Sequence, residues 1–176
     1  EQGSISSSNS QEKLPNIIFL LTDDQRWDSL GCVNSMLKTP NLDSLAANGI
    51  LFSNAYVTSS ICGPSRASIM TGQYARKHGI NDFSTQFTKQ QLTNTYPIKL
   101  KKAGYLTGFV GKYGIGSKNL PADEYDFWAG WPGWGKYEGH NDENGNPIHL
   151  TQKLGNDSIE FLEGCNNDQP FCLSVS

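Results

Sequence analysis

The chain has 176 residues, and its 14 Lys and Arg against 17 Asp and Glu give a formal net charge of −3. This length suits about one domain, and the mild acidity argues against nucleic acid or an anionic membrane as a partner. The 36% of hydrophobic residues can form a core, while 18 Gly and 8 Pro indicate a loop-rich fold. No signal peptide is visible, and the apolar run at Ile17 falls far short of the ~20 residues of a membrane span.

The first 13 residues are rich in Ser, Gln and Asn and have no apolar periodicity. We expect them to be a flexible leader, like the start of a mature exported protein. Because the chain opens with Glu1 rather than Met, we also expect that a preceding segment was removed or was never cloned. The expected location is the periplasm, the cell surface or the extracellular medium.

Strand and helix signals alternate along the rest of the chain. The apolar stretch from Asn16 to Leu21 predicts a strand buried on both faces, and it ends in Thr22-Asp23-Asp24. Proline at the starts and glycine after the ends predict short helices. The helices are expected at 41–49, 64–71, 97–103 and 151–163, further strands at 51–57, 105–110 and 171–175, and a long Trp- and Gly-rich loop at 121–147. This alternation predicts an α/β fold with a largely parallel sheet, and a strand at the very end of the chain suggests that the protein continues.

Four cysteines, Cys32, Cys62, Cys165 and Cys172, allow three complete pairings. None lies in a CxxC, and no Cys and His cluster has the spacing of a zinc site. Cys165 and Cys172 are close enough in sequence for a short disulfide, as an oxidising compartment would favour. The alternative is that both are small buried apolar residues.

The segment Cys62-Gly63-Pro64-Ser65-Arg66 is the most informative in the chain. It opens a helix whose first backbone N–H groups lack internal partners and favour an anion. If the helix extends back to Cys62, that residue and Arg66 share a face. A guanidinium there suits a tetrahedral oxyanion such as sulfate or phosphate. The alternative is a buried cysteine beside a helix whose Arg66 faces solvent.

Two other strand ends carry charged residues. Asp23 and Asp24 follow the first strand, where hard carboxylate oxygens favour Ca²⁺ or Mg²⁺. A solvated turn is the alternative. Lys112 follows another strand within Gly111-Lys112-Tyr113-Gly114, and it can reach a bound anion, although the segment lacks the phosphate-loop pattern. The alternative is a surface lysine in a glycine-rich turn.

Together these segments resemble the type I, formylglycine-dependent sulfatases of the alkaline-phosphatase-like superfamily. The segment from Cys62 to Gly72 is similar to the family's C-x-P-S-R…TG signature, and Asn16 to Asp24 is similar to its first strand with paired metal-binding aspartates. The resemblance implies a three-layer sandwich around a largely parallel sheet. Residues 14–176 would then be the N-terminal part of the catalytic domain.

The resemblance also implies roles for individual residues. Cys62 would be converted by a maturase to formylglycine (3-oxoalanine), whose hydrated form attacks the sulfur of a sulfate ester in covalent catalysis. Asp23, Asp24 and the modified Cys62 would bind Ca²⁺, or Mg²⁺ in its place. Arg66 would stabilise the nucleophile and the negative charge, and Lys112 would bind a sulfate oxygen.

Two departures from the family qualify this interpretation. Family members carry His two residues after the lysine, where this chain has Gly114. The family's second Asp/Asn metal pair, a histidine and a second lysine would fall beyond residue 176. We therefore expect residues 1–176 alone to be inactive.

The predicted substrate is a sulfated saccharide. Trp131 and Trp134 offer stacking surfaces within an aromatic segment, and His149 is a further candidate, although an aromatic core is the alternative. Two other functions stay open. One is a formylglycine-dependent phosphodiesterase or phosphonate monoester hydrolase, and the other is a non-catalytic sulfoglycan-binding protein with unconverted Cys62. The sequence does not predict an oligomeric state.

Overall fold

The computed structural model describes residues 13–176, so the expected leader lies outside the described residues except for Lys13. The main elements are β1 Ile17–Leu20, α1 Pro40–Asn48, α2 Cys62–Thr71, α3 Ala75–His78, α4 Lys89–Leu92, α5 Tyr96–Lys102, β2 Leu106–Lys112, β3 Phe127–Trp131, β4 His140–Asn141, β5 Pro147–Ile148, α6 Leu150–Glu163 and β6 Phe171–Val175. A 3₁₀ turn at Ala122–Glu124 precedes β3, and β4 and β5 form a small antiparallel hairpin. The helices predicted at 41–49, 64–71, 97–103 and 151–163 are confirmed within a few residues.

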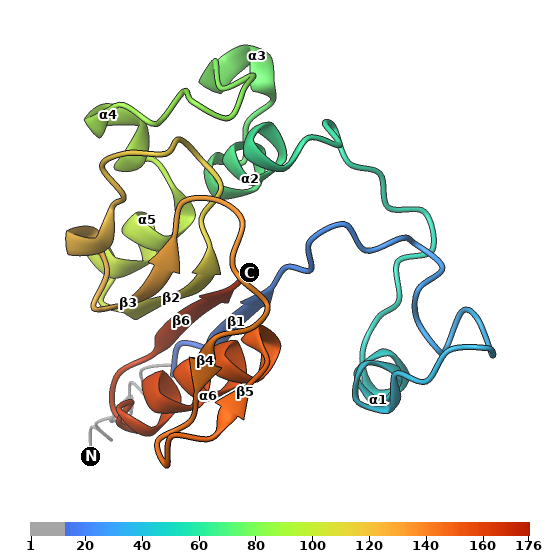
Figure 1. The fold of residues 1–176 in the computed structure, drawn as a ribbon. Coiled ribbons are helices and arrows are strands. Elements are labelled where there is room, and N and C mark those ends of the chain that lie inside the picture. The colour runs from blue at the N-terminus through green and yellow to red at the C-terminus, as the bar shows by residue number, and fades with distance from the viewer. Residues whose placement is uncertain (1–12) are drawn as a thin grey trace, which may run out of the picture.

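The central sheet has four strands in the order β1-β6-β2-β3, and every neighbouring pair is parallel. The final strand, β6, lies between β1 and β2, with Ile17 opposite Cys172 and Gly108 opposite Leu173. Because all four strands run the same way, their carboxyl ends meet at one edge of the sheet (Figure 1).

Helices cover both faces of this sheet. Phe109 and Val110 are consecutive in β2, so their side chains point to opposite faces. Phe109 packs with Met70 of α2 and Ile98 of α5 in one core cluster, while Val110 packs with Phe161 of α6 in the other. The result is a helix–sheet–helix sandwich, and the predicted α/β fold class is confirmed.

The first strand is less buried than its apolar sequence predicts. The side chains of β1 alternate in burial, and Ile18 and Leu20 remain 51% and 57% exposed. The alternation shows that one face of β1 is uncovered, and α1 has no buried residue that would pack there. The expectation of burial on both faces is therefore wrong for this structure.

The strand expected at 51–57 does not form. These residues are turn and irregular backbone, and Phe52, Tyr56 and Val57 are more than 70% exposed. In Figure 1 this segment and α1 extend away from the sheet, so no neighbouring strand supplies the hydrogen bonds that a β-rich sequence needs.

The long loop expected at 121–147 contains a strand. Phe127–Trp131 forms β3, which pairs with β2 so that Lys112 lies opposite Trp131. The sequence did not predict this strand, because its aromatic residues and glycine show no alternation of apolar and polar positions. Trp128 stacks on Phe109 with ring centroids 4.9 Å apart, so this Trp belongs to the core rather than to a saccharide platform.

All four cysteines are free, so the disulfide expected between Cys165 and Cys172 is not formed. Cys172 is 1% exposed within β6, and burial raises the pKa of its thiol to about 11. Burial also raises the pKa of the Cys165 thiol. Cys172 behaves as a buried apolar residue, the alternative that the sequence left open, whereas Cys165 is half-buried. A thiol of raised pKa is a poor nucleophile.

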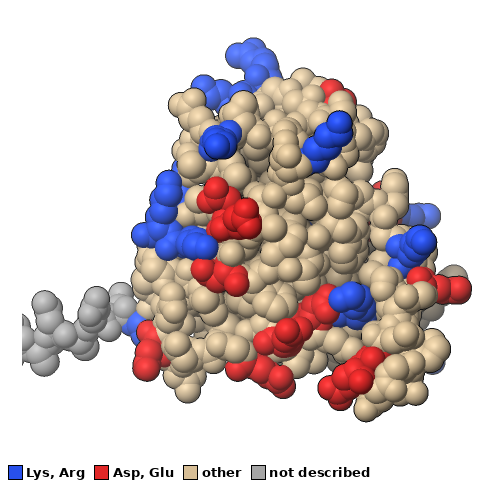
Figure 2. Space-filling view, turned by 60° about the vertical axis from the view of Figure 1, so that its left-hand side comes forward, with Lys and Arg blue, Asp and Glu red and all other residues tan. Residues whose placement is uncertain are grey.

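The surface carries both signs of charge. On the face shown in Figure 2, basic and acidic side chains form separate small groups without a continuous patch of either sign. Among residues 13–176, no helix is long and apolar enough to cross a bilayer.

A buried histidine connects α2 to α3. His78 is 2% exposed, and its Nδ1 accepts the Ile80 backbone N–H at 3.1 Å. The proton is therefore assigned to Nε2, which lies 3.0 Å from Ser68 Oγ and donates to it. Burial lowers the pKa of His78, because the charged ring would lose its hydration.

This burial predicts a pH-dependent stability. Below the ordinary His pKa of 6.5 the unfolded chain binds a proton that folded His78 resists, so the free energy of unfolding should fall as the pH drops. Urea unfolding at pH 7.5 and 5.5 measures the loss, which His78→Asn should reduce and His140→Asn should leave in place. An equal loss in the protein and in His78→Asn would contradict the prediction.

Candidate active site

The candidate site lies at the carboxyl edge of the parallel sheet. Asp23 follows β1, Lys112 is the last residue of β2, and Ser176 follows β6. Helix α2 begins at Cys62, two residues earlier than the sequence predicts, so Cys62 and Arg66 stand one turn apart on the same helix. Ligand sites in open α/β sheets are found at this edge.

Two cationic side chains converge on one carboxylate here. Lys112 Nζ lies 2.8 Å from Asp23 Oδ2, and Arg66 Nη2 lies 3.3 Å from Asp23 Oδ1. Arg66 and Lys112 are only 4% and 7% exposed, whereas the Asp23 side chain is 30% exposed. Burial alone would raise the pKa of Asp23, but hydrogen bonds and charges from Lys112 and Arg66 outweigh it, and the net effect is a lowered pKa.

Arg66 also holds the strand ends together. Its Nη1 donates to the Lys112 carbonyl oxygen at 2.5 Å and to Ser176 Oγ. Helix α2 turns Pro64, Arg66 and Ala67 toward the protein, which buries the guanidinium against the sheet. Sequence reasoning missed Ser176, because a serine after a strand belongs to no motif.

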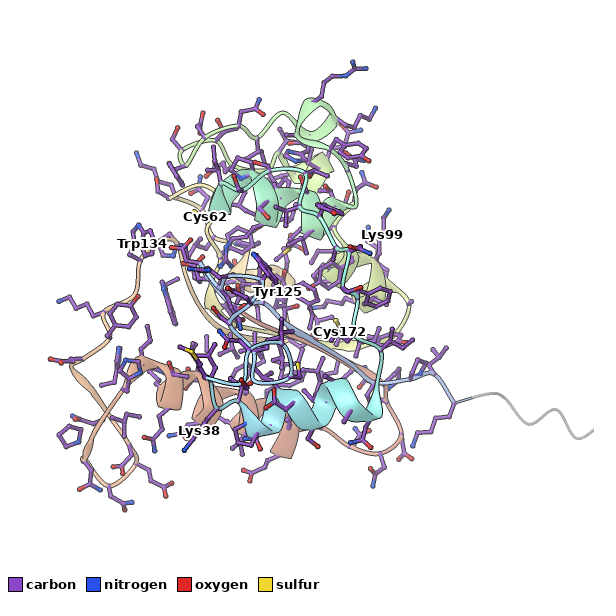
Figure 3. All side chains as sticks on the ribbon, turned by 90° about the vertical axis from the view of Figure 1, so that its right-hand side faces the viewer. Lys38, Cys62, Lys99, Tyr125, Trp134 and Cys172 are labelled. Atoms are coloured by element: carbon purple, nitrogen blue, oxygen red, sulfur yellow. The ribbon has the colours of Figure 1, made fainter. Side chains whose placement is uncertain are left out.

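Cys62 stands half-buried as the first residue of α2 (Figure 3). The preceding residue, Ile61, makes no side-chain cap hydrogen bond, so no capping side chain pairs with the first backbone N–H groups of the helix. A Cβ added at Gly63 would lie 3.0 Å from the Asp82 carbonyl oxygen and 3.1 Å from that of Gly114. The start of the helix is thus packed against the loop that follows Lys112.

The structure brings together Asp23, Arg66 and Lys112 but leaves Asp24 and Cys62 outside their contacts. Among residues 13–176, no hydrogen bond or ion pair joins Asp24 or Cys62 to this cluster. Asp24 has φ 54°, a left-handed conformation unusual for aspartate. Within the same residues, no three His, Cys, Asp or Glu side chains are grouped to hold a metal ion.

Gly114, where the sequence departs from the sulfatase pattern, lies against the side chain of Arg66, which leaves no room for a Cβ. Its φ is +68°, and a Cβ there would lie 2.7 Å from Arg66 Cδ and 3.6 Å from Lys112 Cε. The side chain of Arg66 therefore runs through the space that a larger residue at 114 would need.

The predicted substrate-binding residues Trp131, Trp134 and His149 lie in different environments. Trp134 is 73% exposed, and its ring lies over Lys112 Nζ with 3.9 Å to the centroid. Trp131, Trp134, Asp23 and Lys112 share the wall of a cavity of about 460 Å³. His149 caps α6 by accepting the Thr151 N–H and stacks on Tyr137, so its contacts are structural. No sequence motif predicts the contact between Trp134 and Lys112.

Comparisons with known proteins show the family. Residues 15–176 match the family described as Sulfatase. An N-acetylglucosamine-6-O-sulfatase of Bacteroides thetaiotaomicron is 34% identical over 169 residues, which cover 93% of this chain and 30% of that protein. The human N-acetylglucosamine-6-sulfatase is 34% identical, over 92% of this chain and 33% of its own length.

A solved structure of a protein in complex with its substrate D-glucosamine-2-N,6-O-disulfate superposes with a TM-score of 0.77 and 33% identity. The match covers 93% of this chain and 34% of that one. The fold and these matches define an alkaline-phosphatase-like α/β protein. The chain belongs to the sulfatase family, and it spans about a third of the length of the relatives it matches.

The fit between Gly114 and Arg66 can be tested by adding one methyl group. Gly114→Ala should destabilise the protein by about 2–4 kcal/mol, because it adds a strained φ and forces Arg66 aside. Gly79→Ala is the matched control, since Gly79 has φ +72° with nothing within 4 Å of the added Cβ, and it should show only the cost of the backbone conformation. Equal changes in the urea midpoint for both variants would show that Arg66 does not occupy this space.

Proposed function

We propose that this chain carries the nucleophile and anion-binding half of a sulfatase that hydrolyses sulfate esters of a saccharide. The observation that carries the proposal is the convergence of buried Arg66 and Lys112 on Asp23, beside the start of α2. Two cations against one carboxylate leave a net positive charge in a poorly hydrated place. Such a place favours a second anion, and a sulfate group has the right charge and geometry.

Arg66 and Lys112 would bind the oxygens of the sulfate group. Their N–H donors already point to the carboxyl edge of the sheet, where they contact Asp23. Donors held in advance at the place where negative charge develops need little reorganisation during the reaction. Arg66 is held by the Lys112 carbonyl and Ser176 as well, so it would orient the group rather than follow it.

Cys62 would supply the nucleophile after conversion by a maturase. Its position at an uncapped helix N-terminus places backbone N–H groups and the helix dipole beside it, and both stabilise negative charge. Formylglycine, when formed from Cys62, supplies a hydrated aldehyde whose oxygen attacks sulfur. The raised pKa of the Cys172 and Cys165 thiols makes both poor nucleophiles.

Asp23 and Asp24 would contribute to a calcium site. Asp23 and Asp24 offer the hard oxygen ligands that Ca²⁺ or Mg²⁺ prefers, and Ca²⁺ takes 6–8 such ligands. The two aspartates are consecutive and carboxylate-bearing, but no third His, Cys, Asp or Glu joins them among residues 13–176. We propose that they are part of a metal site completed by other groups, where the ion would supply positive charge to the sulfate.

The proposed substrate class is a 6-sulfated hexosamine. The two relatives named above act by name on N-acetylglucosamine 6-sulfate, and the superposed structure holds a 6-O-sulfated glucosamine. Trp131 and Trp134 line the cavity beside Lys112 and would contact the sugar. We also propose that the protein is exported, because one relative, from Drosophila melanogaster, is by name an extracellular sulfatase.

Replacing Cys62 tests the proposed function. In the intact protein, Cys62→Ala should lower turnover of N-acetylglucosamine 6-sulfate about 10³-fold or more, because no nucleophile remains. The exposed Cys32 provides the control, and Cys32→Ala should keep the wild-type rate. Peptide mass analysis should show Cys62 lighter by about 18 Da, since oxygen replaces sulfur and two hydrogens are lost.

Two results would contradict the proposal. An unmodified Cys62 in an inactive protein that still binds sulfated saccharides would indicate a binding protein. Faster turnover of an aryl phosphodiester than of any sulfate ester would indicate a phosphodiesterase or phosphonate hydrolase with the same fold.

A further inference from the structure

Lys112 is enclosed by two different contacts. Its ammonium bonds to Asp23 Oδ2 on one side and lies over the Trp134 ring on the other, with 2.8 Å and 3.9 Å separations. A lysine ammonium has three N–H donors. One N–H of Lys112 bonds to Asp23, and a second points at the Trp134 ring. The third N–H is therefore free to bond to a ligand in one remaining direction.

Hydrophobic burial does not explain the position of the Trp134 side chain. Its side chain is 73% exposed, whereas Trp128, six residues earlier, stacks inside the core. A large aromatic side chain left this exposed gains little from the hydrophobic effect. The contact that the structure does give it is the ammonium of Lys112, a cation–π pair.

The backbone around Trp134 is tied to the loop that follows Lys112. Tyr113 N–H donates to the Trp131 carbonyl at 2.8 Å, and Gly114 N–H donates to the Pro132 carbonyl at 3.0 Å. On the other side, a Cβ at Gly135 would lie 2.7 Å from Leu150 Cδ2. The backbone before Trp134 is thus hydrogen-bonded to the loop after Lys112, and Gly135 lies close to Leu150 on the other side, so this segment stays near the ammonium.

We propose that Trp134 is a positioning residue for Lys112: its ring face holds the ammonium against Asp23 and directs the free N–H donor toward the incoming sulfate. The inference rests on the proposed function for the identity of the anion. It also means that a sugar cannot stack on the face of Trp134 that Lys112 occupies, so only the opposite face is open to a saccharide.

The contact itself can be tested without any turnover. An indole ring this close to Nζ should shift the NMR signals of the Lys112 side-chain protons upfield, and loss of the signals in Lys112→Met assigns them. Trp134→Phe should keep part of the shift and Trp134→Leu should abolish it. Trp27→Leu, which removes another highly exposed indole, should leave the shift unchanged. A full shift in Trp134→Leu would overturn the proposal.

The consequence for anion binding is measured with inorganic sulfate by calorimetry on the intact protein. Trp134→Leu should weaken sulfate affinity about 3- to 30-fold, the range of a cation–π contact, while Trp134→Phe should recover most of it. Unchanged affinity in Trp134→Leu, or equal losses in the Leu and Phe variants, would overturn the positioning role. A wild-type protein that shows the upfield shift but binds no sulfate would confirm the contact and overturn the proposed function.

Discussion

The ion-pair cluster of Asp23, Arg66 and Lys112 is the interaction on which the rest of the site depends. Burying a guanidinium and an ammonium is costly unless each finds a partner. The carboxylate of Asp23, after β1, pairs with both cations. It thereby joins the end of β1, helix α2 and the end of β2, which are more than 40 residues apart in sequence. Arg66 also donates to the Lys112 carbonyl and to Ser176, so the cluster adds to the packing of Ala67 and Met70 in holding α2 at the ends of β2 and β6.

The same cluster explains why this edge of the sheet should attract an anion. Its components do not neutralise one another, and the carboxylate is the most exposed of the three. Asp23 therefore acts on both cations while remaining within reach of solvent or of a metal ion. If an ion drew Asp23 away, Arg66 and Lys112 would lose their shared partner, and the favourable replacement would be a group with several oxygens. Sulfate is such a group.

Local signals in the sequence were enough for most of the helices and for the residues of the cluster. Proline and glycine mark the ends of α1, α2 and α5. The spacing around Cys62 left open whether Arg66 faces solvent, and the resemblance to the sulfatase signature indicated its place in the site. What failed depended on neighbours that a sequence window does not contain. The segment 51–57 has the composition of a strand but nothing to pair with, and β3 has a poor composition but a partner in β2. The contact of Gly114 with Arg66 joins residues 48 positions apart, and no local pattern encodes it.

Trp128, Trp131 and Trp134 lie close together in sequence, but their positions relative to β3 give them different surroundings. In β3, successive side chains point to opposite faces, so Trp128 joins Phe109 on the side of α2 and α5. Trp131, three residues on, lies on the opposite side and lines the cavity near α6. Trp134 lies beyond the strand, where the backbone is no longer paired in the sheet and the ring can turn onto Lys112. Strand geometry thus separates three rings that are evenly spaced in the sequence. Trp128 stabilises the core, while Trp131 and Trp134 both line the cavity and Trp134 also contacts Lys112.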